Sequence, residues 1–101
     1  MAYRTISIED ARQLLTDETV TVLDIRDPVS FSDGHIENAL HAETVDMDKF
    51  LAQEDKSKPL LVYCYHGISS QSAAAFLTEK GFSQVFSLEG GYTAWSESDE
   101  A

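Results

Sequence analysis

The chain has 101 residues, a length that suits one domain with a single hydrophobic core. With 43% hydrophobic and 10% aromatic residues and two prolines, its composition is typical of a globular protein and excludes a fibrous or disordered one. Eighteen acidic residues against seven basic ones give a formal net charge of -11. The electrostatic field of this negative charge repels nucleic acids and anionic membranes, so we expect neither as a partner.

The first signals along the chain predict a strand, a helix and a second strand. Residues 3–6 form a short strand candidate, and Ser7 is placed to cap the helix that follows. The apolar residues of this helix recur at helical spacing, as Ile8, Ala11, Leu14 and Leu15. Residues 20–25 are β-branched and almost continuously apolar, which predicts a central strand covered on both faces.

The middle of the chain carries the clearest turn signals. Asp27 is placed to cap a short helix that has Pro28 in its first position and that ends by Gly34. Residues 39–42 predict a short strand, and residues 45–53 predict a helix. A charged connection then leads to the second half of the chain.

The second half repeats the alternation of strand and helix. Residues 60–63 predict a strand, and residues 71–80 predict a helix that Gly81 stops. The residues expected on the buried stripe of this helix are Ala73, Ala74, Phe76 and Leu77. Residues 85–88 predict the last strand, and the glycine pair 90–91 precedes a short helix whose aromatic residues we expect in the core.

This order of elements indicates an α/β fold. Strands that are separated by helices need crossover connections, which favour a mostly parallel central sheet with helices on both faces. Reactive groups in such open sheets lie beyond the carboxyl ends of the strands. We expect one domain over residues 1–101, with an acidic tail that frays from about residue 97.

One residue combines that position with a reactive side chain. Cys64 follows the apolar run 60–63, and the polar loop 65–70 and a helix come directly after it. Loop amides and a helix N-terminus supply partial positive charge that stabilises a thiolate, which makes Cys64 a candidate nucleophile. A buried, inert cysteine is the alternative that residue type alone would favour.

Cysteine usage and the amino-terminal residues indicate the compartment. A single cysteine cannot form an internal disulfide, which fits a reducing environment. The first residues lack an apolar segment of signal-peptide length, and no run approaches the length of a membrane span. We therefore expect a cytoplasmic protein.

Four segments in register support a family resemblance. They are Asp24-Ile25-Arg26, residues 31–39, the cysteine loop and residues 88–95, which reads Leu-Glu-Gly-Gly-Tyr-Thr-Ala-Trp. Each segment is weak alone, but in this order and spacing they resemble the rhodanese homology domain across nearly the whole chain. The loop, which reads Cys-Tyr-His-Gly-Ile-Ser-Ser, is similar to that of the small single-domain thiosulfate sulfurtransferases of bacteria.

The resemblance implies a two-step transfer of sulfur. The Cys64 thiolate would attack the sulfane sulfur of thiosulfate, expel sulfite and keep the sulfur as a persulfide. Cyanide, or a thiol such as thioredoxin, would then accept it. No cofactor and no metal is implied.

The loop after Cys64 would bind the substrate, and its members are Tyr65, His66, Gly67, Ile68, Ser69 and Ser70. Because the loop lacks the cationic side chains of larger rhodaneses, charge must come from backbone amides. His66 either contributes a proton or positive charge, or points outward and shapes the loop. Ser69 and Ser70 either donate to thiosulfate or cap the helix, which we expect of at least one. Gly67 allows a close backbone approach, and Ile68 is an apolar wall or docking contact.

Other polar residues have structural interpretations. His35 and His41, with Glu37 and Glu43 nearby, have the residue types of a metal site, but the Gly-His-Ile segment is structural in the resembled family. Asp24 and Arg26 are expected to pair, with attraction of an anion by Arg26 as the alternative.

Two alternative functions stay open. A persulfide carrier that relays sulfur to one protein partner shares its chemistry with the enzyme, so the sequence does not separate the two. A phosphatase or arsenate reductase would need an arginine six positions after the cysteine, where this chain has Ser70.

Overall fold

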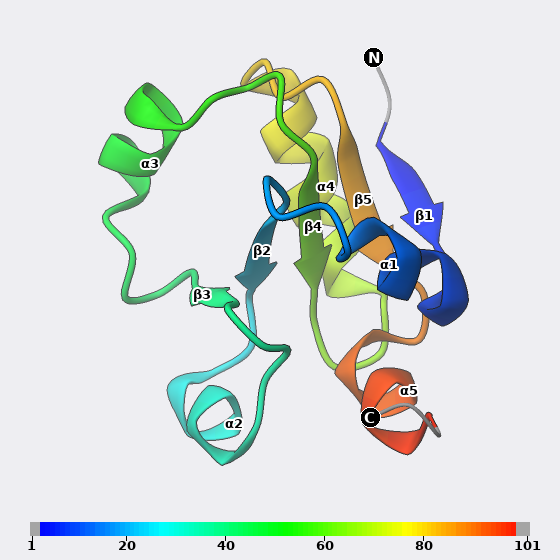
Figure 1. Ribbon diagram of the computed structural model, residues 1–101. Helices are drawn as coiled ribbons and strands as arrows, with labels where there is room; N and C mark the ends of the chain where they lie inside the picture. Colours follow the sequence, from blue (N-terminus) through cyan, green and yellow to red (C-terminus); the bar gives the residue numbers. More distant parts are fainter. Residues whose placement is uncertain (1–2, 99–101) are drawn as a thin grey trace.

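Five parallel strands form one sheet in the computed structural model, which describes residues 3–98. The strands are β1 (Arg4–Ile6), β2 (Thr21–Asp24), β3 (Leu40–His41), β4 (Leu60–Tyr63) and β5 (Val85–Leu88). Their order across the sheet is β1-β5-β4-β2-β3, and every neighbouring pair is parallel (Figure 1). The expected α/β class and parallel sheet are thereby confirmed, and β2 is an inner strand.

Four helices connect the strands, and a fifth follows the last strand. They are α1 (Ile8–Leu14), α2 (Pro28–Asp33), α3 (Met47–Gln53), α4 (Ser69–Glu79) and α5 (Gly91–Glu97). In Figure 1, α1 lies in front of the sheet and α4 behind it, while α2 and α5 lie below, toward the carboxyl ends of the strands. No helix within residues 3–98 is long and apolar enough to cross a membrane.

Hydrophobic clusters on the two faces of the sheet hold these layers together. Because side chains alternate along a strand, Leu61 and Tyr63 of β4 join the cluster that α1 and α5 cover, whereas Leu60 and Val62 join the one beneath α4. All four are at most 1% exposed, so β4 is buried on both faces. The candidate nucleophile Cys64 therefore follows the most deeply buried strand of the sheet.

Element boundaries follow local capping. Ser7 accepts a hydrogen bond from the Asp10 amide, and Asp27 accepts one from the Ser30 amide, so both expected caps are confirmed. The third helix starts at Met47, two residues later than expected, because Asp46 caps it.

One prediction for the second half of the chain is wrong, and another concerns residues that the structure does not describe. Phe76 is 45% exposed, so it does not belong to the buried face of α4, where Ser70, Ala74 and Leu77 are buried and Ala73 is partly buried. Glu97 is the last residue of α5. The rest of the tail expected to fray, residues 99–101, lies outside the described residues.

A buried ion pair braces the carboxyl end of β2. Arg26 Nη2 donates to Asp24 Oδ2 at 2.7 Å and to the Gly34 carbonyl at 2.6 Å, and the guanidinium carbon lies 4.2 Å from the centre of the Tyr92 ring. This confirms the expected pairing. Burial opposes ionisation of Asp24, but the hydrogen bonds from Arg26 outweigh it and hold the pKa of Asp24 below its ordinary value.

Asp24→Asn should therefore destabilise the protein strongly, because it leaves the buried Arg26 guanidinium without a counter-charge. We expect urea unfolding at pH 7 to show a loss of about 3 kcal/mol. The lowered pKa of Asp24 contributes stability above about pH 4, the unfolded value, and this part is lost as pH falls through the folded value. The stability of Asp24→Asn should lack the part that depends on ionisation of Asp24 and should therefore fall less steeply at acidic pH. The exposed Asp33→Asn is the control, and an equal loss there would contradict the assignment.

The start of α5 closes against the chain after β4. The Tyr92 amide donates to the Cys64 carbonyl at 2.8 Å, and the Thr93 amide donates to the Tyr65 carbonyl at 3.0 Å. Gly91 has a φ of 61°, and a Cβ there would come within 2.5 Å of the Cys64 carbonyl oxygen. The glycine pair is thus a tight turn, as expected, and it also permits this contact.

Gly91→Ala should lower the free energy of unfolding by about 2 kcal/mol or more, since it adds a backbone clash to the cost of a positive φ. Gly81→Ala is the matched variant, because Gly81 also has a positive φ but its Cβ would meet only the flexible Lys56 side chain, at 3.2 Å. Urea denaturation of both variants measures the difference. A loss in Gly81→Ala as large as in Gly91→Ala would contradict the role of the clash.

Candidate active site

Cys64 lies at the carboxyl end of β4 with its sulfur surrounded by hydrogen-bond donors. The Gly67 and Ser70 amides each donate to Sγ at 3.2 Å, and the Ser70 hydroxyl oxygen lies 3.3 Å from it. The residue is 5% exposed. It is therefore buried, but its sulfur faces polar groups, unlike a cysteine that serves only to fill a hydrophobic core.

These donors change the acidity of the thiol. Burial by itself raises the pKa of Cys64, since it penalises the anion. The Ser70 hydroxyl and the amides of Ser70, Gly67 and His66 outweigh burial, so the pKa of Cys64 lies below its ordinary value. The N-terminus of α4, which begins at Ser69, adds the positive end of an eleven-residue helix.

Gly67 gives the loop its tight path. Its φ is 87°, and a Cβ at this position would come within 2.8 Å of the Gly90 nitrogen and 3.0 Å of the Leu88 oxygen. The expectation of a close backbone approach is confirmed. The approach holds the cysteine loop against the turn that starts α5.

The capping role expected of Ser69 or Ser70 is wrong. Both residues are already helical, Ile68 precedes them at the N-cap position, and no side chain makes the cap hydrogen bond of α4. The Ser70 side chain is fully buried and points to Cys64. Its hydroxyl also lies 2.7 Å from the hydroxyl of Ser87.

The remaining loop side chains are exposed around the buried sulfur. Ile68 is 76% exposed, and Tyr65, His66 and Ser69 are exposed as well. The outward interpretation of His66 fits this position. The Tyr65 hydroxyl binds the Ser30 hydroxyl at 2.6 Å and the Asp27 carboxylate, which ties the loop to the start of α2.

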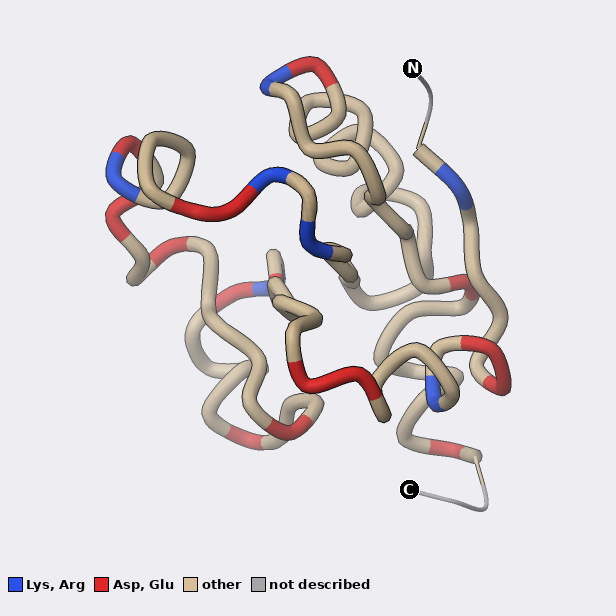
Figure 2. Tube along the Cα trace, turned by 45° about the horizontal axis from the view of Figure 1, so that its top comes forward, with Lys and Arg blue, Asp and Glu red and all other residues tan. Residues whose placement is uncertain are grey.

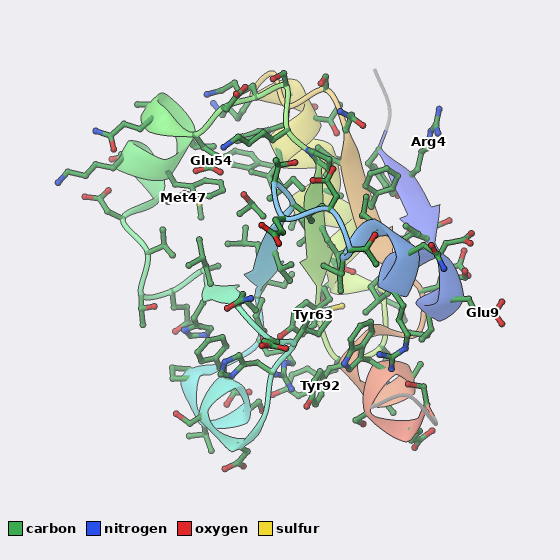
Figure 3. The ribbon with its side chains drawn as sticks, viewed as in Figure 1. Arg4, Glu9, Met47, Glu54, Tyr63 and Tyr92 are labelled. Carbon is green, nitrogen blue, oxygen red and sulfur yellow. The ribbon has the colours of Figure 1, made fainter. Side chains whose placement is uncertain are left out.

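Figure 3 labels Tyr63, at the end of β4, and Tyr92, on α5, whose rings lie close together. Their ring centres are 5.9 Å apart. Arg26 packs against Tyr92 and is bound to Asp24, so its charge is already paired. The guanidinium of Arg26 is therefore not free to attract an anion, as the alternative interpretation would require.

The loop that surrounds the sulfur carries no formally charged side chain. Figure 2 shows the acidic residues spread over helices and loops, and the loop of residues 65–70 contains no Lys, Arg, Asp or Glu. In residues 3–98 no group of three or more His, Cys, Asp or Glu side chains is placed to hold a metal ion. His35 and His41 instead bind the carbonyls of Phe31 and Arg26, at 2.8 and 2.6 Å.

Two contacts of the site were missed in the sequence. Ser87 is a polar residue inside an otherwise apolar strand, and that exception was the available signal. Nothing in the sequence indicates the hydrogen bond between Tyr65 and Asp27. The two residues are far apart in the chain, and each already has a role in its own segment, Asp27 as a helix cap and Tyr65 as a loop residue.

Together these groups can stabilise a thiolate and an anion that approaches it. The sulfur is nucleophilic when ionised, and preorganised amides can bind negative charge that moves onto an attacking or departing group. This is chemistry for sulfur or acyl transfer rather than for a reaction that needs a charged clamp.

Comparisons with known proteins agree with this geometry. The model of the family described as rhodanese-like domain matches residues 7–98. The thiosulfate sulfurtransferase GlpE of Shewanella oneidensis is 42% identical over 98 residues, which cover 97% of each chain. GlpE of Coxiella burnetii is 45% identical over 95 residues, which cover 94% of this chain and 89% of that protein.

A solved structure from Rhodopseudomonas palustris, described as a protein of unknown function and possible tyrosine phosphatase, superposes with a TM-score of 0.78. It is 30% identical, and the match covers 94% of this chain and 80% of that one. Fold likeness alone thus spans proteins with different suggested activities. The family model and the GlpE relatives, each matching more than nine-tenths of the chain, establish that this protein belongs to the rhodanese-like domain family.

Proposed function

We propose that the protein is a thiosulfate sulfurtransferase that uses Cys64 as its nucleophile. The thiolate attacks the sulfane sulfur of thiosulfate and forms a new S–S bond. The S–S bond of thiosulfate breaks, and its electron pair leaves with sulfite. Cys64 then carries a persulfide. Cyanide attacks the outer sulfur and leaves as thiocyanate, or a thiol takes that sulfur as its own persulfide, and the thiolate is regenerated.

The observation that carries this proposal is the set of donors around one sulfur atom. Two amides and one hydroxyl lie 3.2 to 3.3 Å from Cys64 Sγ, in a loop without a cationic side chain. Such donors stabilise a thiolate before the substrate arrives and need no reorganisation during the reaction.

The loop from Tyr65 to Ser70 is the proposed substrate site. Its backbone amides converge near the sulfur and would bind the sulfite group as it acquires the electron pair. The hydroxyl of Ser69, which is exposed at the start of α4, is a further donor for thiosulfate oxygens. Gly67 permits the loop path, and Tyr65, His66 and Ile68 form the rim.

Thioredoxin is the cellular acceptor that we favour, in the cytoplasm, where a catalytic thiol stays reduced. Tyr65 and Ile68 at the rim and Val29 on α2 are large, exposed apolar side chains, which suit contact with a protein that must bring its own thiol to the persulfide. A carrier that serves one protein partner would use the same surface and differ in turnover.

A phosphatase or arsenate reductase is not supported by the site. The position six residues after Cys64 holds Ser70, and the nearby Arg26 is paired with Asp24. A transferring phosphoryl group would thus lack the bidentate arginine that stabilises its charge.

Incubation with thiosulfate should add one sulfur atom to the mass of the reduced protein, as mass spectrometry of the intact chain can measure. Cys64→Ser should show no addition, because the hydroxyl cannot form a persulfide, and should lose sulfurtransferase activity by a factor of about 1,000 or more. Cyanide or reduced thioredoxin should remove the added sulfur. Rapid, repeated transfer of sulfur to these acceptors indicates an enzyme. A single, slow transfer indicates a persulfide carrier that serves one protein partner.

The same experiment has a matched control. Ser83→Ala removes an exposed hydroxyl outside the loop of residues 65–70, leaves the Cys64 donors in place and should still acquire sulfur. Addition of sulfur to Cys64→Ser, or hydrolysis of an aryl phosphate by the native protein with no sulfur addition, would contradict the proposal.

Ser70→Ala should shift the pH dependence of the first step. Since the hydroxyl of Ser70 holds the pKa of Cys64 down, its loss raises that pKa, and the thiolate fraction falls at pH values below it. We expect kcat/KM for thiosulfate to fall about tenfold at the acidic end of the profile and to recover as pH rises. Stopped-flow or initial-rate measurements across pH test this, and a loss that is constant with pH would contradict it.

A further inference from the structure

A second buried hydroxyl lies behind the one that contacts Cys64. Ser87 is on β5, is 1% exposed, and its Oγ lies 2.7 Å from the Oγ of Ser70. Val62 of β4 is its register partner. Because side chains alternate along β5, Ser87 shares with Val85 the face that α4 covers, whereas Phe86 and Leu88 point to the opposite face. A polar side chain thus occupies a core position beneath the helix that carries Ser70.

The hydrogen bonds of this pair depend on the ionisation of Cys64. When Cys64 is a thiol and its proton points to Ser70 Oγ, the contact between the two serine hydroxyls, in which either oxygen can be the donor, uses only one of their two protons. The other hydroxyl proton then has no acceptor among the side-chain hydrogen bonds of residues 3–98, since the two hydroxyls make no others there. A buried donor that lacks an acceptor is destabilising.

Ionisation reverses the chain of donors. Once the thiol proton has left to solvent, Ser70 can donate to the sulfur, and Ser87 can donate to Ser70. Every hydroxyl proton of the pair then has an acceptor, and the two amides of Gly67 and Ser70 also face an anion. The buried pair is therefore fully satisfied in the thiolate state and not in the thiol state.

We propose that Ser87 is a positioning residue, which donates to Ser70 Oγ and so directs the Ser70 proton to the Cys64 sulfur. Ser87 touches neither the sulfur nor the substrate in this arrangement. It acts through Ser70, and its contribution appears as a larger thiolate fraction at neutral pH. The inference rests on the proposed function only for its effect on turnover, because ionisation of Cys64 can be measured without any sulfur donor.

Titratable groups around the sulfur come from several elements, and the first turn of α4 contributes none. They are Tyr63 at the end of β4, Tyr65 and His66 in the loop, Asp24 and Arg26 at β2, Glu89 after β5 and Tyr92 on α5. Substitution of Ser87 leaves all of them in place. A change in the ionisation of Cys64 in that variant is therefore attributable to the hydroxyl.

The test is the pH dependence of alkylation of Cys64 by iodoacetamide, the single cysteine of the chain. For Ser87→Ala we expect a rate constant about three- to tenfold below that of the native protein on the acidic side of the profile, and equal rates at high pH. Ser87→Gly removes the same hydroxyl with a different loss of packing and should shift the profile in the same direction. Circular dichroism and thermal unfolding establish that each variant is folded.

Two comparisons separate this role from a general effect on structure. Ser83→Ala removes an exposed hydroxyl near the start of β5, which binds the Lys56 carbonyl, and should leave the profile unchanged. In a Ser70→Ala background, Ser87→Ala should have no additional effect, because the residue through which it acts is absent.

The proposal is overturned if the profile of folded Ser87→Ala coincides with that of the native protein. It is also overturned if Ser87→Ala slows alkylation by the same factor with and without Ser70, since the two residues would then act independently. Sulfur addition from thiosulfate is measured separately. If alkylation shifts as expected but no sulfur is added, the proposed function fails and the role of Ser87 stands.

Discussion

The close approach of two backbone turns is the constraint on which the rest of the site depends. The turn after β4 and the turn before α5 meet at Gly67 and Gly91, where added Cβ atoms would come within 3 Å of the opposing backbone. This contact fixes the Gly67 amide on the Cys64 sulfur, and the first amides of α5 bind the Cys64 and Tyr65 carbonyls. The positions of these amide groups depend mainly on the backbone and little on side chains. The sulfur is held by peptide groups whose directions follow from the paths of two turns.

A site built from backbone donors differs physically from one built on a cationic side chain. The chain has a net charge of -11, yet the loop from 65 to 70 has no formally charged residue, and Arg26 is neutralised by Asp24. The favourable potential at the sulfur is therefore short in range, because partial charges on amides act only over a few ångströms. Such a site stabilises an anion once it is in contact but does little to attract it from solution.

The sequence was sufficient for the framework and insufficient for the polar details. Hydrophobic runs and caps predicted every strand and helix, because β4 and β2 are buried on both faces and Ser7 and Asp27 make the hydrogen bonds that their positions imply. The role of Ser70 was misjudged because local capping and a tertiary contact compete for the same hydroxyl, and the nearby sulfur is visible only in the fold. Phe76 was placed in the core by helical spacing alone, although the face that α4 buries is narrow.

Hydroxyl groups suit this site for a reason that amides cannot supply. A backbone N–H has a fixed direction and donates whether or not the sulfur is charged, so it favours the anion but cannot respond to it. A serine hydroxyl can rotate and can act as donor or acceptor, so it accepts from a thiol and donates to a thiolate without a change in position. Ser70 is buried beside the sulfur, and the second hydroxyl, 2.7 Å away, adds a proton that finds an acceptor in the thiolate state and not in the thiol state. A site that must release and regain its charge in each cycle therefore combines fixed amides, which set the average acidity, with rotatable hydroxyls, which follow the charge.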